Sequence, residues 1–261
     1  MILPQWPAPK NVKALATERE VSSPLGISLP PYEQLNLGDH VGDQSQHVVA
    51  NRRQLLNTLS HCDDIRWLQQ IHGTECLDAD SIANGAQADA SFTQQKQLAC
   101  AVMTADCLPV LFCDLQGRQV AAAHAGWKGL ANGVLETTLG TFVSNGIPPE
   151  QVIAWMGPAI TQSAFEVGPE VRQAFMHFKG GERWADDGCF MAGAGDRLQA
   201  NLYRLTKLQM EHLGIAGVYG GDENWCTFAA KNNNGKKEYR FFSYRREAIT
   251  GRQASLIWLA D

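Results

Sequence analysis

Apolar residues gather in short runs through the middle of the chain, and turn residues separate these runs. Three of them predict strands at 98–103, 108–113 and 119–124, with a turn at 114–117 between the second and the third. A helix is expected next, near 130–145. Its apolar face and its stop signal come from Leu130, Val134, Leu135 and Leu139, followed by Gly146 and Pro148.

The second half of the chain alternates between strand-like and helix-like segments. VIAWM at 152–156 predicts a strand, and PEVRQAFMHF at 169–178 predicts a helix. The longest helix is expected near 195–213, where leucines recur at spacings of four, three and three. Further strands are expected near 215–219 and 239–244.

Adjacent strands followed by helices favour an α+β fold with a mixed, largely antiparallel sheet and flanking helices. A doubly wound fold would alternate strands and helices more regularly. The sequence shows no long Pro/Ser/Gly linker, low-complexity run or internal repeat, so residues 1–261 are expected to form a single domain.

Composition and charge narrow the class of protein. The net charge is −5, and the one basic cluster, at 231–240, is rich in Asn and Gly, which argues for a loop and against a nucleic-acid surface. The segment 4–12 is polar and broken by prolines, and no apolar stretch approaches the length of a membrane span. Seven cysteines without CxxC pairs fit a reducing compartment. We therefore expect a soluble, cytoplasmic protein.

Three potential metal ligands lie in Gly- or Asp-containing segments beside predicted strands: His72 in QQIHGTE, Cys107 in MTADCLP and His124 in AAAHAGWKG. Taken singly, a cysteine or histidine is more often structural than functional. Strand ends can converge, however, and two imidazoles with one thiolate make a zinc site with an open fourth position, as catalytic zinc requires. Glycines 126 and 129 lie at the junction between the predicted strand and the predicted helix, where an anion such as phosphate is favoured.

Motifs along nearly the whole chain resemble the YfiH family, also called the laccase-domain or multicopper polyphenol oxidoreductase family. The motifs are LNLGDHVGD (35–43), NRR (51–53), QIHG, ADASFT (88–93), TADCLP, HAGWKG, GPAI (157–160), FEVGPEV (165–171) and FFSYRR with TGR (241–252).

The resemblance implies a zinc-dependent purine nucleoside phosphorylase acting on adenosine, inosine and methylthioadenosine, with adenosine deaminase activity. His72, Cys107 and His124 correspond to the family's zinc ligands and catalytic residues. Related proteins have also been linked to peptidoglycan-precursor editing and to copper-dependent phenol oxidation. The resemblance further implies a fold similar to the cytotoxic-necrotizing-factor toxin domain, a cysteine hydrolase whose Cys and His dyad would correspond to Cys107 and His124.

The expected partners are purine nucleosides and inorganic phosphate, bound by a monomer. We expect arginine to bind the phosphate, because a guanidinium presents paired donors to anionic oxygens. The candidates for substrate binding are Arg52 or Arg53, Arg245 or Arg246, Asn36 and Gln70, and Glu166 is a candidate acid or base.

Several alternatives stay open at this point. The HxE and PCxxC signature of zinc nucleobase deaminases is absent, and so are the HxH pairs of multicopper oxidases. Two histidines and one cysteine also suit a mononuclear copper centre. A metal-independent hydrolase would use Cys107 as nucleophile and His124 as base. A structural zinc site would need a fourth ligand, for which Cys76, Cys100 and Cys113 are candidates.

Overall fold

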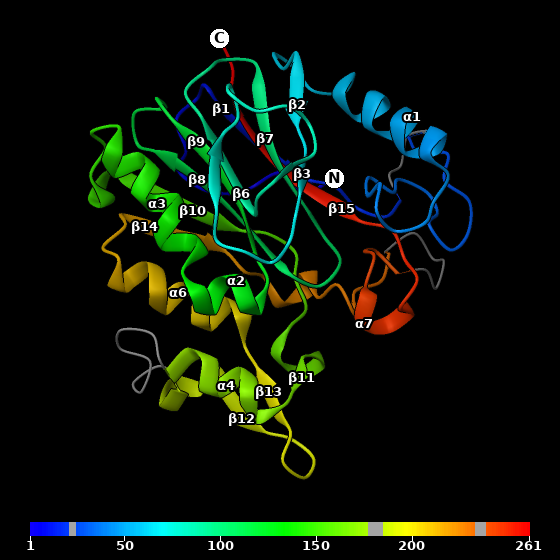
Figure 1. Ribbon diagram of the computed structural model, residues 1–261, viewed down its shortest axis with the longest axis vertical. Helices are drawn as coiled ribbons and strands as arrows, with labels where there is room; N and C mark the ends of the chain where they lie inside the picture. Colours follow the sequence, from blue (N-terminus) through cyan, green and yellow to red (C-terminus); the bar gives the residue numbers. More distant parts are fainter. Residues whose placement is uncertain (21–24, 177–184, 233–238) are drawn as a thin grey trace.

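The computed structural model describes residues 1–20, 25–176, 185–232 and 239–261 (Figure 1). Two β-sheets lie face to face at its centre. The smaller sheet consists, from edge to edge, of β1 (Val12–Ala16), β15 (Gln253–Leu259), β7 (Leu98–Thr104) and β2 (Asp64–Arg66). The larger consists of β14 (Gly217–Gly220), β10 (Val152–Met156), β8 (Leu108–Asp114), β9 (Val120–Ala125), β6 (Ala90–Thr93) and β4 (Cys76–Asp78).

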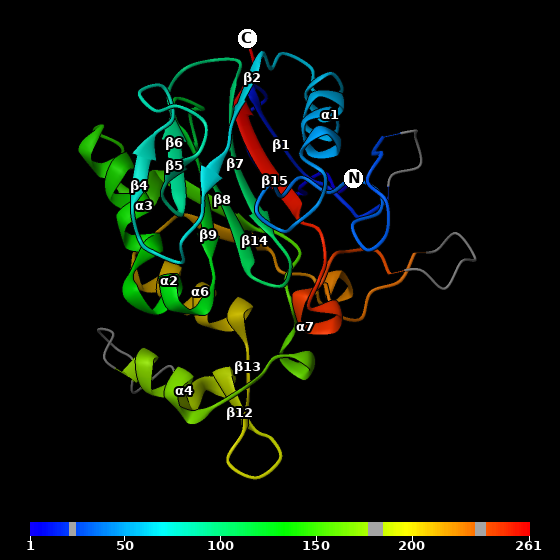
Figure 2. The ribbon, with the colours of Figure 1, turned by 45° about the vertical axis from the view of Figure 1, so that its right-hand side comes forward.

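Helices cover the outer faces of both sheets, so the fold has four layers (Figures 1 and 2). The smaller sheet is covered by α1 (Ser45–Leu56), and the larger by α2 (Trp127–Asn132), α3 (Val134–Ser144) and α6 (Leu202–His212). The central pairings are antiparallel, and β2, β4 and β14 pair in parallel near the edges. A mixed, largely antiparallel α+β fold is confirmed, but it has two large sheets where the sequence predicted one.

The central strands are apolar throughout because both of their faces are buried. On β8, Leu108, Val110 and Phe112 pack toward the helices, while Leu111 and Cys113 pack toward the other sheet. Strands buried on both faces read as continuous apolar runs, and period 2 then assigns alternate residues to the two cores. The strands predicted at 98–103, 108–113, 119–124 and 152–156 are confirmed.

A small lobe extends from the sandwich at the bottom of Figures 1 and 2. It contains β11 (Glu166–Val167), α4 (Pro169–Met176), β12 (Phe190–Ala192) and β13 (Leu198–Ala200). The remaining short elements are β3 (Leu68–Gln69), β5 (Ala86–Gln87) and α7 (Tyr244–Glu247), with the turns η1 (Pro149–Gln151), η2 (Gln162–Ala164), η3 (Ala185–Cys189) and η4 (Glu223–Trp225).

Several predicted elements differ from the structure. The helix expected after His124 begins earlier, at Trp127, and is divided by Gly133, whose φ of 100° is left-handed. The helix at 169–178 is found as α4, and its last two positions lie outside the described residues. The strand at 215–219 is found as β14, two residues later.

The prediction of the longest helix at 195–213 is wrong. Leu198–Ala200 instead forms β13, paired with both β11 and β12, and α6 starts only after Asn201, whose side chain accepts a hydrogen bond from the Arg204 N–H. Within the described ranges the longest helix is α1, with 12 residues against 11 in α6.

The prediction of a strand at 239–244 is also wrong. Tyr239 forms only an isolated bridge with Lys231, and Phe241 and Phe242 are buried in an irregular segment. Ser243 then caps α7 by accepting a hydrogen bond from the Arg246 N–H. All seven cysteines are free thiols, as expected. The described part of the chain contains no helix that is long and apolar enough to cross a membrane.

Candidate metal centre and active site

Strand pairing brings Cys107 and His124 together. Cys107 ends the three-residue turn that carries the chain from β7 in one sheet to β8 in the other. The antiparallel register of β8 and β9 sets Leu108 opposite Ala125 and Pro109 opposite His124. Cys107 therefore lies beside the end of β9, where His124 is almost completely buried.

The carboxylate of Asp89 brings His72 to the same place. It accepts hydrogen bonds from the backbone N–H groups of Ile71 (3.1 Å), His72 (3.0 Å) and Gly73 (2.6 Å). The other contact of Asp89 Oδ1 is with His124 Nδ1, at 2.7 Å. His72 itself has a φ of 59°, a conformation that non-glycine residues rarely adopt and that three backbone bonds can hold in place.

The three predicted ligands form one cluster. Cys107 Sγ lies 3.9 Å from His72 Nε2, the two imidazole centroids are 4.9 Å apart, and one ligand atom from each residue lies within 4.8 Å of the others. The backbone at Gly126 passes close by, because a Cβ there would lie 3.0 Å from His72 Cδ2 and 3.2 Å from Cys107 Sγ. The glycine expected at this junction leaves room for the cluster.

Charge interactions favour a thiolate at Cys107. Burial alone raises the pKa of a thiol, but the charges of His124 and His72 and their hydrogen bonds to Cys107 outweigh it and lower the pKa of Cys107 to about 6. Burial by itself lowers the pKa of His124, whereas Cys107 and Asp89 raise it overall. These interactions therefore favour a thiolate at Cys107, and a thiolate is the form that binds metals.

The donor set fits zinc. Asp89 engages Nδ1 of His124, which leaves Nε2 for the cluster, and a carboxylate behind a ligating histidine is common at zinc sites. Ligand atoms on one tetrahedral zinc are about 3.3–3.8 Å apart, so a small contraction of the cluster would suffice. In the part of the chain that the structure describes, no fourth His, Cys, Asp or Glu joins the group, and Cys76, Cys100 and Cys113 lie elsewhere on strands. The arrangement is that of an open site.

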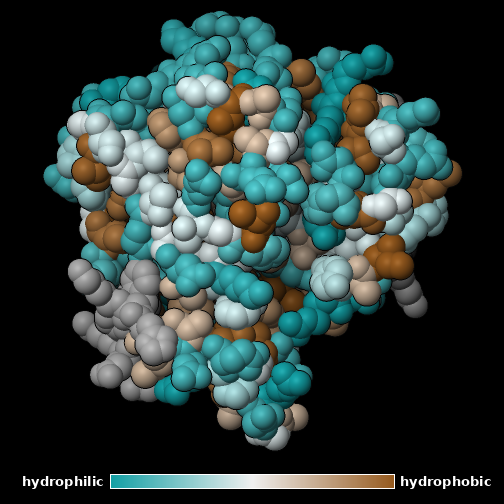
Figure 3. All heavy atoms as spheres, viewed as in Figure 1, coloured by the Kyte–Doolittle hydropathy of each residue, from teal (hydrophilic) through white to brown (hydrophobic). Residues whose placement is uncertain are grey.

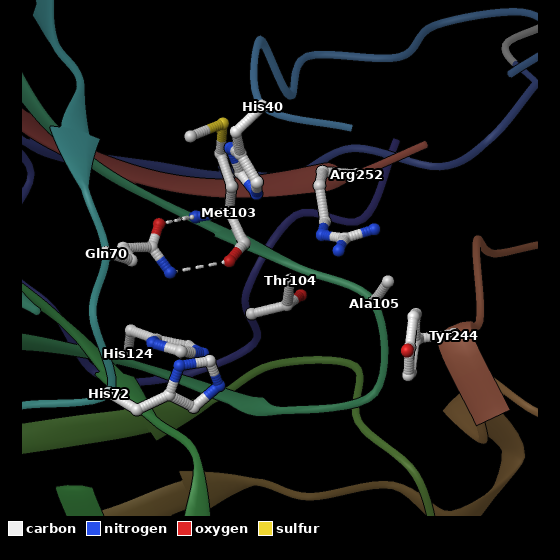
Figure 4. A pocket seen from close by; sticks show the side chains of 9 residues that line it. All are labelled: His40, Gln70, His72, Met103, Thr104, Ala105, His124, Tyr244 and Arg252. Atoms are coloured by element: carbon white, nitrogen blue, oxygen red, sulfur yellow. Dashed lines mark hydrogen bonds between the residues drawn. The ribbon is translucent and has the colours of Figure 1, made fainter. Parts of the chain in front are cut away.

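A cavity of about 250 Å³ lies against the cluster (Figure 4). Nine residues line it: His40, Gln70, His72, Met103, Thr104, Ala105, His124, Tyr244 and Arg252. Gln70 holds the wall together, because its side-chain amide both accepts from Met103 N (2.7 Å) and donates to Met103 O (2.8 Å). Figure 4 shows the Arg252 guanidinium across the cavity from His72 and His124.

The other predicted site residues lie around the cavity without lining it. Asn36 is fully buried, and its side chain bonds to Asp43 and to the backbone of Gly38 and Arg252. Arg53 is exposed on α1, whereas its neighbour Arg52 donates to Leu37 O and stacks on Trp67. Asn36 thus supports the loop that carries His40 and the segment that carries Arg252.

The two arginines after Ser243 are engaged with other parts of the fold. Arg245 donates to Glu166 O and lies over Phe165, and Glu166 is exposed on β11. Arg246 is largely enclosed, and its guanidinium donates to three backbone carbonyls and stacks on Tyr239. Those carbonyls belong to Thr227, Phe228 and Phe241.

Sequence reasoning missed four residues at the site: His40, Asp89, Tyr244 and Arg252. Their signals lie inside the quoted motifs, since Asp89 belongs to ADASFT and Arg252 to TGR. Asp106 lies next to Cys107, and its carboxylate accepts hydrogen bonds from Arg245 N (2.7 Å) and from Thr227 Oγ1 (2.6 Å). The bond to Arg245 N holds the start of α7, which carries Tyr244, close to the cluster.

The chain belongs to the family described as multi-copper polyphenol oxidoreductase laccase, whose model matches residues 14–260. It is similar to the protein named purine nucleoside phosphorylase YfiH of Escherichia coli K12, with 44% identity over 260 residues, covering 99% of this chain and 98% of the relative. It is equally similar to purine nucleoside phosphorylase PA4543 of Pseudomonas aeruginosa, with 44% identity over 261 residues, covering 100% and 98%.

Solved structures agree on the fold. The Neisseria meningitidis protein NMB0706 superposes with a TM-score of 0.87 at 42% identity, covering 100% of this chain and 99% of that one. The Bacillus licheniformis protein YfiH gives a TM-score of 0.80 at 28% identity, covering 95% and 92%. The expected likeness to the toxin domain stays a prediction.

The copper chemistry in the family's description does not match the ligands of this chain. A multicopper centre needs many closely paired imidazoles, whereas this sequence has seven histidines and no HxH pair. The group found among the described residues offers three ligands to one ion. Such a group suits a single zinc or a single copper ion.

Proposed function

We propose that the protein is a zinc-dependent purine nucleoside phosphorylase acting on adenosine, inosine and methylthioadenosine with inorganic phosphate. The observation that carries the proposal is a three-ligand cluster opening onto a cavity that Arg252 faces from the other side. Relatives that match almost the whole chain are named purine nucleoside phosphorylases, which supports the phosphorylase part of the proposal. We further propose that the protein is a cytoplasmic monomer. The seven free thiols support a reducing compartment.

The reaction breaks the bond between ribose C1′ and a purine nitrogen and forms one between C1′ and a phosphate oxygen. The departing purine keeps the bonding electrons and takes up a proton. Arg252 binds the phosphate in this proposal: its Nη1 donates to Thr250 O and Gly251 O, which fixes the plane of the guanidinium and favours directed contacts to anionic oxygens.

His72, Cys107 and His124 would hold the zinc. Zinc held there would supply Lewis acidity. Asp89 keeps the His124 ring in one orientation, and Gln70 keeps the His72 loop against β7. Because Met103 and Ala105 also line the cavity, part of its wall is apolar.

Adenosine deamination is included in the proposal as a second activity of the same site. It requires water to attack C6 and a proton donor for the departing ammonia. Among the described residues that line the cavity none is Asp or Glu, so the donor would be His40 or solvent. We therefore expect deamination to be slower than phosphorolysis.

The test incubates adenosine with zinc-loaded or chelator-stripped protein, with and without phosphate, and separates adenine, inosine and ribose 1-phosphate by chromatography. Equal amounts of adenine and ribose 1-phosphate are expected only when zinc and phosphate are both present. Arg252→Met should lower kcat/KM for phosphate about 100-fold, since a hydrogen bond to a charged group contributes about 1.5–3 kcal/mol. The matched control is Arg245→Met, which changes an exposed arginine that does not line the cavity, and its kcat/KM should stay within about two-fold of wild type.

Full turnover by stripped protein would refute zinc dependence, and a zinc-loaded protein that releases no adenine would refute phosphorolysis. If Arg245→Met lost as much activity as Arg252→Met, the assignment of the phosphate site would be wrong.

A second candidate function is a metal-independent cysteine hydrolase, for example in peptidoglycan-precursor editing. The alignment of Cys107, His124 and Asp89, with the lowered pKa of the thiol, favours it. Such an enzyme keeps its activity after chelation and loses it on alkylation of Cys107, whereas the zinc enzyme loses activity on chelation and regains it with added Zn²⁺. Copper-dependent phenol oxidation is the third candidate, and copper-loaded protein incubated with a phenol under oxygen tests it.

A further inference from the structure

A second cavity, of about 240 Å³, adjoins the first. His40 lines both of them, and Gln69 of the second is next in sequence to Gln70 of the first. The second cavity is lined by Asp39, His40, Trp67, Leu68, Gln69 and Gly85. The two cavities therefore flank one histidine side chain, which is about half exposed.

The two cavities differ in chemistry. The first is lined by Arg252 and by two of the three proposed metal ligands, His72 and His124, so it suits an anion. The second has an apolar wall of Trp67 and Leu68 and one carboxylate, Asp39, whose side chain is 59% exposed. It suits a flat, mainly apolar ligand that carries N–H donors.

The Asp39 carboxylate is held in place by two neighbours. Its Oδ2 lies 3.3 Å from Arg52 Nη2, and its Oδ1 lies 3.5 Å from His40 Nδ1. Arg52 is in turn fixed by stacking on Trp67 at 4.5 Å and by donating to Leu37 O at 3.0 Å. A carboxylate fixed in this way is preorganised to accept further hydrogen bonds, so a ligand need not order it.

Size and reaction geometry connect the two cavities. Ligand pockets commonly measure about 300–1,000 Å³, so the first cavity alone is small for a nucleoside together with phosphate. In phosphorolysis the phosphate and the purine lie on opposite sides of C1′. If phosphate lies between Arg252 and the cluster and ribose lies beside His40, the purine is directed toward the second cavity, because His40 lines both cavities.

We propose that the second cavity is the purine-base subsite of this enzyme, with the Asp39 carboxylate accepting hydrogen bonds from the base. The donors are the 6-amino group of adenine or N1–H of hypoxanthine, and Trp67 and Leu68 provide the apolar wall. Enzymes that take a base out of a nucleic acid recognise it by the same combination of edge hydrogen bonds and apolar contact. This inference rests on the proposed phosphorylase function and adds to it where the base binds.

The test measures, by calorimetry, the binding of adenine, hypoxanthine and inorganic phosphate to zinc-loaded wild-type protein and three variants. Asp39→Ala removes the acceptor, and Gln69→Phe fills the cavity by an independent route. Asp63→Ala removes an exposed carboxylate outside both cavities and is the matched control. Asp39→Ala and Gln69→Phe should each weaken binding of both bases about ten-fold, leave the Kd for phosphate within about two-fold and raise KM for adenosine. Asp63→Ala should change none of these values.

Unchanged base binding in Asp39→Ala and Gln69→Phe, with wild-type phosphorolysis intact, would overturn the subsite alone. Equal weakening of phosphate and base would also overturn it, because the variants would then have disturbed the whole site. Base binding that depends on Asp39 and Gln69, without release of ribose 1-phosphate, would support the subsite and refute the phosphorylase. Wild-type protein that binds neither base would refute both.

Discussion

At the scale of single residues, one buried carboxylate organises the cluster. Asp89 fixes the backbone around His72 and the ring of His124 at the same time, so both imidazoles depend on it. Asparagine has the same shape as aspartate. Its NH₂ group, however, would replace an oxygen that now accepts hydrogen bonds from the N–H groups of Ile71 and Gly73, so donors would face donors.

Asp89→Asn is therefore expected to lower zinc affinity about 10- to 100-fold, the usual cost of losing the partner of a ligating histidine. Competition with a chromophoric chelator measures the affinity, and circular dichroism checks that the variant is folded. Asp114→Asn, a buried aspartate remote from the cluster, is the control and should bind zinc as wild type does. Unchanged affinity in Asp89→Asn would show that the carboxylate does not position the ligands.

The clustering of His72, Cys107 and His124 could be predicted from the sequence, because each is a potential metal ligand in a turn beside an apolar strand. The arginine that lines the cavity could not. Arg245, Arg246 and Arg252 lie within eight positions in similar surroundings, and their roles follow from packing that only the folded chain reveals. The Arg246 guanidinium donates its hydrogen bonds to backbone carbonyls. Arg252, in contrast, follows Gly251, which packs against Phe242 and Asn36.

At the scale of elements, the central strands could be predicted because both of their faces are buried. Elements that mix polar and apolar residues were missed. β15 was missed because Gln253 and Ser255 interrupt its apolar residues, although both are buried and Gln253 bonds to the Phe242 backbone. α1 was missed because most of its residues are polar and few are buried, among them Val48 and Leu55. Local pattern predicts an element well only where burial is uniform.

The turn between β8 and β9 gives a prediction about stability. Burial alone raises the pKa of Asp114, but the Arg118 side chain and the N–H groups of Gln119, Arg118 and Gln116 lower it overall. A carboxyl whose pKa is lower in the folded state stabilises above its unfolded pKa, and loses this effect as pH falls through the folded value.

Asp114→Asn should therefore lower the free energy of unfolding at pH 7 by about 1–3 kcal/mol. The difference from wild type should shrink as pH falls below about 4, the unfolded pKa of aspartate. Urea denaturation at pH 7 and at pH 3 measures it, with Asp63→Asn as an exposed control. A difference that stays constant across this pH range would rule out the carboxylate's charge as its cause.

At the scale of the whole molecule, the site depends on contacts that local patterns do not encode. β15 pairs with β1 from the opposite end of the chain, and the six-stranded sheet joins strands from 76 to 220. The sequence predicted the class of fold and many of its strands, but not the two-sheet sandwich. Cys107 lies where the chain crosses between the sheets, so the cluster joins parts of the fold that are distant in sequence.

A metal bound there should stabilise the fold as a whole. Zinc at about 1,000 times its Kd adds about 4 kcal/mol by mass action, because it binds the folded state. With about 2 °C per kcal/mol for a chain of this size, Tm should rise by roughly 8 °C between chelated and zinc-loaded protein. Scanning calorimetry with and without zinc measures the shift.

Cys107→Ser should fold but lose most of the shift in Tm, whereas Cys226→Ser, which changes a buried cysteine outside the cluster, should retain it. A full shift in Cys107→Ser would mean that zinc binds elsewhere, because a site that has lost its thiolate cannot give the same linkage between metal and folding.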